Sequence, residues 1–243
     1  WRINKMRKIS LICCALLSVA VLACNKTEDP NTKPEKPTPE KPEPKPEPKP
    51  EPEPQNSAII VVGQEYLSDK EFYDAVMWVD GKRFAFTKGE HDSFCNTVYT
   101  YKDSVFIAAT EAVGELVSDE YYGDYNENNG VVYSFKIGEE DKFKRTVYGG
   151  VKGKSTASGV AYSNGNIYVS GFDSPGFDRR ALYWKNDRKF ELTDGSVDAL
   201  AYCVAADGDD VYVGGYIQSK DFKKEGAAVI WKNGQEQKLT GDG

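Results

Sequence analysis

A tyrosine-rich and acidic segment, residues 111–129, carries the strongest candidates for binding chemistry in the chain. Tyr121, Tyr122 and Tyr125 stand there among carboxylates such as Asp124. Tyrosine rings between acids can stack on sugar rings or anchor a protein partner. We therefore expect these four residues to bind a glycan or a protein ligand. The alternative is a solvated loop without a ligand.

The same segment offers oxygen ligands at alternate positions, at Asp124, Asn126 and Asn128. Calcium loops use such a pattern, but an EF-hand needs more acids and a downstream Glu. We therefore expect no cofactor. Calcium at these three residues is the weaker alternative.

Catalytic motifs are scarce in the sequence. His91 is the only histidine, so the chain offers neither a His-based triad nor a multi-histidine metal site. It contains no sialidase-type Ser-x-Asp-x-Gly box and no Gly-x-Ser-x-Gly. A carboxylate pair such as Asp119 and Asp124 could serve glycosidic chemistry. We predict no catalytic residue and favour binding over catalysis, with a polysaccharide hydrolase or lyase as the alternative.

The N-terminus carries the clearest motif. Cys24 closes the run Val21-Leu22-Ala23-Cys24, behind the basic pair Arg7 and Lys8 and an uncharged stretch over residues 9–23. This order resembles the lipobox of bacterial lipoproteins. The resemblance implies a signal peptide over residues 1–23, an acylated Cys24 and attachment to a membrane through lipid. An ordinary secretory signal or a short membrane anchor is the alternative, although the apolar run is shorter than the about 20 residues of a spanning helix.

Acidic residues follow the cysteine closely, in Lys26-Thr27-Glu28-Asp29. This run resembles the export tag of surface lipoproteins in the Bacteroidota. The resemblance implies an outer-membrane protein that faces the cell surface, with the periplasmic side as the alternative.

Residues 24–56 have the composition of a spacer. Eleven of the twelve prolines lie between Pro30 and Pro54, alternating with Lys and Glu. Proline favours extended polyproline II and cannot build a core, so we expect a disordered tether. A Pro-rich recognition ligand is the alternative.

From residue 57 to residue 243 the chain repeats itself. Segments such as "DVYVGGY" and "NIYVSGF" align on small residues spaced by 46, 62 and 44 positions, which are Gly63, Ala109, Gly171 and Gly215. A second element follows each, aligned on Trp78, Ser134, Trp184 and Trp231. Four copies with a period near 47 are typical of propeller repeats with four strands each.

Each repeat can be divided into two hairpins, with strands a to d. Asn164-Gly165 or Asp207-Gly208 joins strands a and b, and Asp80-Gly81 or Asn233-Gly234 joins strands c and d. Such dipeptides readily form type I′ turns. The alternation of β-branched and aromatic residues is typical of half-buried strands. We therefore predict an all-β fold, a β-propeller of four-stranded antiparallel blades with strand c tryptophans in the core.

The repeats resemble the Kelch type of propeller. Gly214-Gly215 matches the Kelch double glycine, whereas Ser170-Gly171 and Ala108-Ala109 depart from it. The first repeat opens at strand b, and "LTGDG" at the end of the chain parallels "LTDGS" at residues 192–196. This predicts an incomplete ring, a fragment of a longer propeller. A closed ring of four blades, an open β-solenoid and a β-sandwich are the alternatives.

Charge and cysteines restrict the partners. The chain has a net charge of −7, and the acids are concentrated in the repeats, so we expect no nucleic acid partner. Cys95 and Cys203 remain after the signal and the lipid site, on strand a of different repeats. We expect two buried thiols without a disulfide, because equivalent strands of separate blades lie too far apart.

These features predict a membrane-anchored binding or scaffold protein. The tight a–b and c–d turns lie at one face of the propeller, so the longer b–c and d–a connections share the opposite face. His91 falls in a d–a connection, where we expect an exposed side chain. We expect this loop face to hold the glycan, peptide or protein partner.

Overall fold

A computed structural model of the chain describes residues 58–87, 91–119, 123–149, 154–174, 178–219 and 225–240. The side chains of residues 114–119 and 123–126 are not described. Every described residue belongs to one compact unit. None of the described helical residues forms a helix long and apolar enough to cross a membrane.

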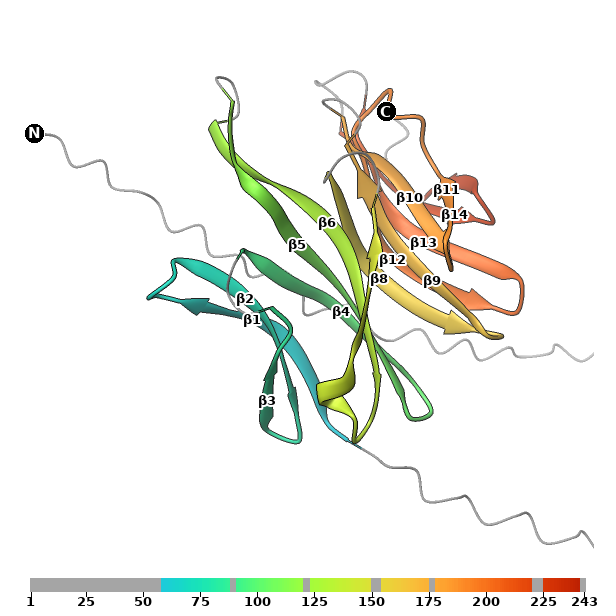
Figure 1. Ribbon diagram of the computed structural model, residues 1–243. Helices are drawn as coiled ribbons and strands as arrows, with labels where there is room; N and C mark the ends of the chain where they lie inside the picture. The colour runs from blue at the N-terminus through green and yellow to red at the C-terminus, as the bar shows by residue number, and fades with distance from the viewer. Residues whose placement is uncertain are drawn as a thin grey trace, which may run out of the picture. The chain divides into compact units, whose positions relative to one another are not determined.

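The described residues form four antiparallel sheets, numbered 1 to 4 in chain order, in which consecutive strands pair with each other (Figure 1). Sheet 1 contains β1 (Ile60–Leu67), β2 (Phe72–Val79) and β3 (Lys82–Ala85). Sheet 2 contains β4 (Ser93–Tyr101), β5 (Ser104–Asp119), β6 (Gly123–Lys136) and β7 (Lys144–Tyr148), with the 3₁₀ turn η1 (Glu140–Lys142) before β7. Sheet 3 contains β8 (Ser155–Ser163), β9 (Asn166–Asp173), β10 (Arg180–Lys185) and β11 (Arg188–Glu191). Sheet 4 contains β12 (Ala199–Asp207), β13 (Asp210–Ile217), β14 (Ala227–Lys232) and β15 (Gln235–Lys238).

The predicted all-β class is therefore confirmed. So is the prediction that the first repeat opens at its second strand, because sheet 1 has three described strands where the other sheets have four. The first strands of sheets 2 to 4, which are β4, β8 and β12, are called the inner strands below. β1, β5, β9 and β13 are the equivalent second strands.

Three hydrophobic clusters join the sheets, one between each pair of neighbours in chain order. Strand β5 shows how this works. Val105 and Ile107 belong to the cluster shared with sheet 1, whereas Phe106 and Ala108 belong to the cluster shared with sheet 3. Successive side chains of a strand point to opposite faces, so sheets 2 and 3 are buried on both faces. All three clusters lie within residues 58–240.

The inner strands lie next to one another, with β4 beside β8 and β8 beside β12. Asn96 and Thr97 of β4 donate hydrogen bonds from Nδ2 and Oγ1 to the carbonyl oxygens of Ala157 and Ser158 in β8, both at 2.7 Å. The backbone of each inner strand has an irregularity at this point, where one residue is left without a partner in the second strand. The sheets are thus linked at their inner strands as well as through their faces.

A close approach between strands explains the small residues of the repeat. A Cβ atom at Gly171 would overlap the carbonyl oxygen of Thr156 in β8, and one at Gly215 would overlap that of Leu200 in β12. The same Cβ atoms would lie 3.3 Å from the Trp184 ring and 2.7 Å from the Trp231 ring. Only glycine leaves room for both the inner strand and the indole.

The predicted alignment of the tryptophans was wrong by one residue in sheet 2. Gly171 and Gly215 pair with Leu182 and Val229, two residues before Trp184 and Trp231. Ala109 pairs with Val131, so Tyr133 and not Ser134 takes the tryptophan position. Tyr133, Trp184 and Trp231 are buried in the cluster shared with the preceding sheet, which confirms the predicted core role of Trp184 and Trp231. Trp78 is only half-buried, because no described sheet precedes sheet 1.

Three of the four predicted turns are confirmed, whereas Asp207 pairs with Asp210, so Gly208-Asp209 forms the turn there and only Gly208 has a positive φ. Both residues of Asp80-Gly81, Asn164-Gly165 and Asn233-Gly234 have positive φ, as a type I′ turn requires. Asp80 and Asn233, between the third and fourth strands, also accept a hydrogen bond at 2.8 Å from the backbone N–H of Ile59 and Val211. The side chain of each turn therefore holds the start of the second strand.

We predict that Gly215→Ala destabilises the fold by about 1–3 kcal/mol, because the new methyl group forces the inner strand or Trp231 to move. Urea unfolding of the soluble chain, residues 25–243, measures the change. Gly63→Ala is the matched control, since a Cβ there meets only the Trp78 ring, at 3.8 Å. Equal stability of the two variants would contradict the close approach.

The two remaining cysteines are unbonded, as predicted, but Cys95 is only half-buried and Cys203 is exposed. Val204 and Ala206 pack toward sheet 3, so Cys203 points to the other face of β12. Burial raises the pKa of Cys95 to about 12. We therefore predict that a thiol reagent at pH 7 labels Cys203 of the native soluble chain and leaves Cys95 unlabelled until urea is added. Mass spectrometry of the labelled peptides checks this, and labelling of Cys95 in the native state would contradict it.

Candidate functional site

The predicted binding loop, residues 111–129, is largely a β-hairpin. Strand β5 continues to Asp119 and β6 starts at Gly123, with a register irregularity between Val113 and Val117. In Figure 1 this hairpin projects beyond the neighbouring strands. The prediction of a loop was wrong. Polar residues and glycines are typical of loops, but the backbone of this segment forms two paired strands.

The predicted ligand-binding residues fall on or near this hairpin. Tyr121 and Tyr122 lie outside the described residues, as does Cys24. Asp124 and Tyr125 lie on β6 opposite Ser118 and Val117, and only their backbone is described. Their binding role stays a prediction.

The calcium alternative assumed a loop, and the structure has a strand there instead. Asp124, Asn126 and Asn128 all belong to strand β6, where alternate residues lie about 6.8 Å apart along one face. An extended strand does not wrap its side chains around an ion as a calcium loop does. Among the described residues, no group of three or more His, Cys, Asp or Glu side chains is placed to hold a metal ion. Calcium binding itself stays a prediction.

An acid–base pair recurs at the end of the second strand in the first three sheets. Glu65, Glu111 and Asp173 each follow the small residue by two positions. The basic partner lies on the last strand of each sheet and pairs with the residue at the tryptophan position. These partners are Arg83, Arg145 and Lys189. The nearest N to O distances are 2.5 Å in sheet 1 and 3.4 Å in sheet 3, and Arg145 contacts both carboxylate oxygens of Glu111.

The pair in sheet 2 is the centre of a polar cluster in which Glu111 and Tyr133 are buried and Arg145 is partly exposed. The Tyr133 hydroxyl donates to Glu111 Oε1, and Arg145 Nε donates to the same oxygen at 2.9 Å. Burial raises the pKa of Tyr133 well above its ordinary value, and the Glu111 carboxylate raises it further. The hydrogen bond to Glu111 raises the pKa of Arg145. This cluster borders a cavity of about 340 Å³ between sheets 1 and 2, which His91 also lines. His91 is exposed, as predicted.

Sheet 4 lacks the pair because both of its positions have changed. Ile217 replaces the acid, and Glu236 occupies the position of the base. A larger pocket of about 760 Å³ opens here between sheets 3 and 4, and we call it the groove. The lining residues come from the 191–197 connection, from both sides of the 217–227 connection and from β15: Glu191, Leu192, Thr193, Asp194, Ser196, Val197, Ile217, Gln218, Ser219, Glu225, Gly226, Ala227, Glu236 and Lys238.

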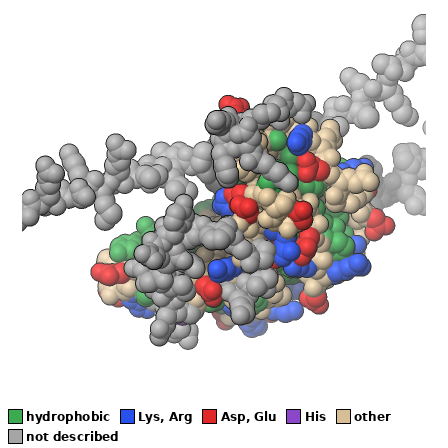
Figure 2. Space-filling view, turned by 90° about the horizontal axis from the view of Figure 1, so that it is seen from above, with side chains coloured by type: hydrophobic (Ala, Val, Ile, Leu, Met, Phe, Trp, Pro, Cys, Tyr) green, Lys and Arg blue, Asp and Glu red, His purple; other side chains and the backbone are tan. Residues whose placement is uncertain are grey.

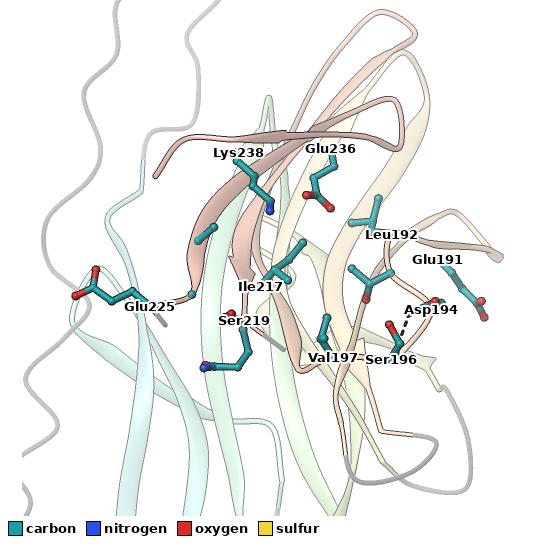
Figure 3. A pocket seen from close by; sticks show the side chains of 14 residues that line it. Glu191, Leu192, Asp194, Ser196, Val197, Ile217, Ser219, Glu225, Glu236 and Lys238 are labelled. Atoms are coloured by element: carbon teal, nitrogen blue, oxygen red, sulfur yellow. Dashed lines mark hydrogen bonds between the residues drawn. The ribbon is translucent and has the colours of Figure 1, made fainter. Parts of the chain in front are cut away.

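The groove is lined by apolar side chains, such as Ile217, together with polar and charged ones. Figure 3 shows Glu236 and Lys238 pointing from β15 toward Ile217, while Glu191 and Glu225 extend away on opposite sides. Hydroxyl groups and an amide complete the lining, which contains no aromatic ring among the described residues. Ligand pockets often combine apolar side chains with a few polar groups in this way. Seen from above, acidic and basic side chains are interspersed (Figure 2).

The connection that forms one wall of the groove is held by an ion pair. Asp198 accepts hydrogen bonds from the backbone N–H of Arg179 at 2.9 Å and from its Nε at 2.8 Å. The Arg179 guanidinium lowers the pKa of Asp198, and the carboxylate raises the pKa of Arg179. Asp92 makes the equivalent backbone contact with Tyr73 N–H in sheet 1, at 2.8 Å.

Sequence reasoning missed the groove, which lies at the connections where a partner was expected, and binding there stays a prediction. Ile217 and Glu236 are 19 positions apart, and neither belongs to a motif. Aligning the repeats would have shown that an acid and a base are replaced there. No protein-family model and no curated protein matches the chain.

We predict that Asp198→Asn destabilises the soluble chain by about 1 kcal/mol at pH 7, since the pair is partly exposed. The folded-state pKa of Asp198 lies below its ordinary 3.8. The stabilisation is therefore complete above that pH and is lost as the pH falls through the lower folded value. Unfolding of both proteins at pH 7 and pH 3 measures this. A difference that grows on acidification would contradict the assignment.

Proposed function

We propose that the chain is a lipid-anchored cell-envelope protein whose part from Ser57 onward is a β-propeller-type module that binds a peptide segment of a partner protein. Acylation of Cys24 attaches it to the outer membrane, and the Pro-rich residues 25–56 hold the module away from the lipid. These two steps rest on the lipobox and on the composition of the tether.

The arrangement of the sheets supports the propeller architecture. Consecutive antiparallel sheets pack face to face in chain order, and their inner strands lie side by side. Propeller blades are related in this way about a central channel. In sheets 2 to 4, the second strand ends where the inner strand begins. Both pockets open at this end of the sheets.

The groove between sheets 3 and 4 is the observation that carries the proposed binding function. An apolar side chain of the ligand would rest on Ile217, Val197 and Leu192. Peptide N–H and C=O groups would bond to the polar and charged side chains, of which Glu236 accepts and Lys238 donates. Sugar rings are usually held against aromatic faces, and the described lining offers none. A peptide therefore fits better than a glycan.

A display library of random peptides, selected on the soluble chain, tests this proposal. We expect enriched peptides that share an apolar residue between polar ones, with micromolar affinity. The double variant Glu236→Ala with Lys238→Ala should weaken their binding at least tenfold. Gln237→Ala is the matched control, because Gln237 lies between these residues on the opposite face of β15.

Three results would contradict the proposal. The first is a library that yields no peptide sensitive to the groove variant. The second is binding to a glycan array in place of peptides. The third is turnover of a polysaccharide, which would favour the enzymatic alternative. A further variant, in which residues 114–126 are shortened to a tight turn, reports whether the hairpin contributes to binding. If this variant loses binding while the groove variant keeps it, the site is on the hairpin.

A further inference from the structure

Strand β1 has one edge to which no described strand is paired. In sheets 2 to 4, the second strand pairs with an inner strand on one side and with a third strand on the other. β1 pairs with β2 only. An open edge carries a row of unpaired backbone N–H and C=O groups, onto which another extended chain can be added.

The residues of β1 match those that receive an inner strand elsewhere. Gly63 occupies the position of Gly171 and Gly215, where an inner-strand carbonyl leaves no space for a Cβ atom. At Gly63 a Cβ atom would meet only the Trp78 ring, at 3.8 Å. The described structure gives no reason for glycine there, whereas a strand paired along this edge would.

Val61 is 52% exposed, whereas the equivalent Ile107, Val169 and Val213 are 0%, 0% and 1% exposed. Those three pack against the preceding sheet, and no described sheet precedes sheet 1. In sheet 3, Val160 of the inner strand lies directly opposite Val169. An added strand would place a side chain opposite Val61 in the same way.

The edge also lacks the usual protection against pairing. Proteins that keep an edge strand free commonly place proline, lysine or a bulge on it. The sequence of β1, IVVGQEYL, contains neither proline nor lysine, and its pairing with β2 is regular. Its one charged side chain, Glu65, is held by Arg83.

We propose that the free edge of β1 binds an extended polypeptide segment with the residue pattern of the inner strands, in antiparallel register. In β4, β8 and β12, the residue opposite the small position is Cys95, Ala157 or Ala201. One unpaired residue follows, and pairing then continues. The bound segment therefore has a small residue opposite Gly63, one bulged residue, and then a run opposite Val62, Val61 and Ile60. It would lie beside β4, as β4 lies beside β8.

A synthetic peptide with the β8 sequence, Ser-Thr-Ala-Ser-Gly-Val-Ala-Tyr-Ser, is the probe. Fluorescence anisotropy of the labelled peptide with the soluble chain measures binding. We expect saturable binding that weakens at least tenfold in Gly63→Val, because the valine side chain occupies the space of the incoming carbonyl. A peptide with proline in place of its valine should bind at least tenfold more weakly, since proline lacks the N–H.

Gly149→Val is the matched protein control. A Cβ atom there also meets a single side-chain atom at 3.8 Å, Val147 Cγ1, but Gly149 follows β7 on the far side of sheet 2. Circular dichroism of both variants confirms that they fold. This proposal is independent of the groove, so the Glu236→Ala and Lys238→Ala double variant should bind the probe as the unmodified chain does.

Binding that is absent, or that Gly63→Val and the proline peptide leave unchanged, would overturn the proposal. So would self-association of the soluble chain that Gly63→Val abolishes, because a second copy would then be the occupant.

Discussion

The close approach of an inner-strand carbonyl to a glycine of the second strand, beneath the ring of a third-strand tryptophan, organises sheets 3 and 4. Gly171 and Gly215 make this contact with Thr156 and Leu200. Because the glycine has no side chain, the indole can lie across the strand and reach the preceding sheet. The same local contact thus sets the strand spacing within a sheet and the packing between sheets.

Sheet 2 shows that the contact can be adjusted. Ala109 replaces the glycine, and Tyr133 replaces the tryptophan. The Tyr133 hydroxyl bonds to Glu111, which also pairs with Arg145. Arg145 is partly exposed, so this polar cluster adds to the aromatic packing of the sheet and does not replace it.

The acid–base pair differs between the sheets that border the two pockets. In sheets 1 to 3 it links the second strand to the fourth at the loop end of the sheet. In sheet 4, Ile217 and Glu236 cannot form such a pair, and the groove lies above them. A substitution at two repeat positions therefore converts a structural contact into a candidate binding surface without changing the fold.

The repeat, its turns and its small residues could be predicted from the sequence because each depends on local chemistry, such as the positive φ of Asn233-Gly234. The position of Tyr133 could not, since Tyr133 follows the long β5–β6 hairpin and its spacing from Ala109 therefore differs from that in the other sheets. The exposure of Cys203 could not either, because the unpaired residue before it, Tyr202, changes the face to which Cys203 points. The hairpin of β5 and β6 was not predicted, because its polar residues are typical of a loop. The groove combines residues from three segments, and only the packing of sheets 3 and 4 brings these together.

Amide hydrogen exchange of the soluble chain, resolved to single residues, tests the repeat most directly. In an antiparallel strand, successive amides point to alternate edges, and only the hydrogen-bonded ones are protected. The account predicts slow exchange along both edges of β9 and β13, and an alternation of slow and fast amides in β1. Uniformly slow exchange throughout β1, or an alternating pattern in β9 and β13, would contradict it.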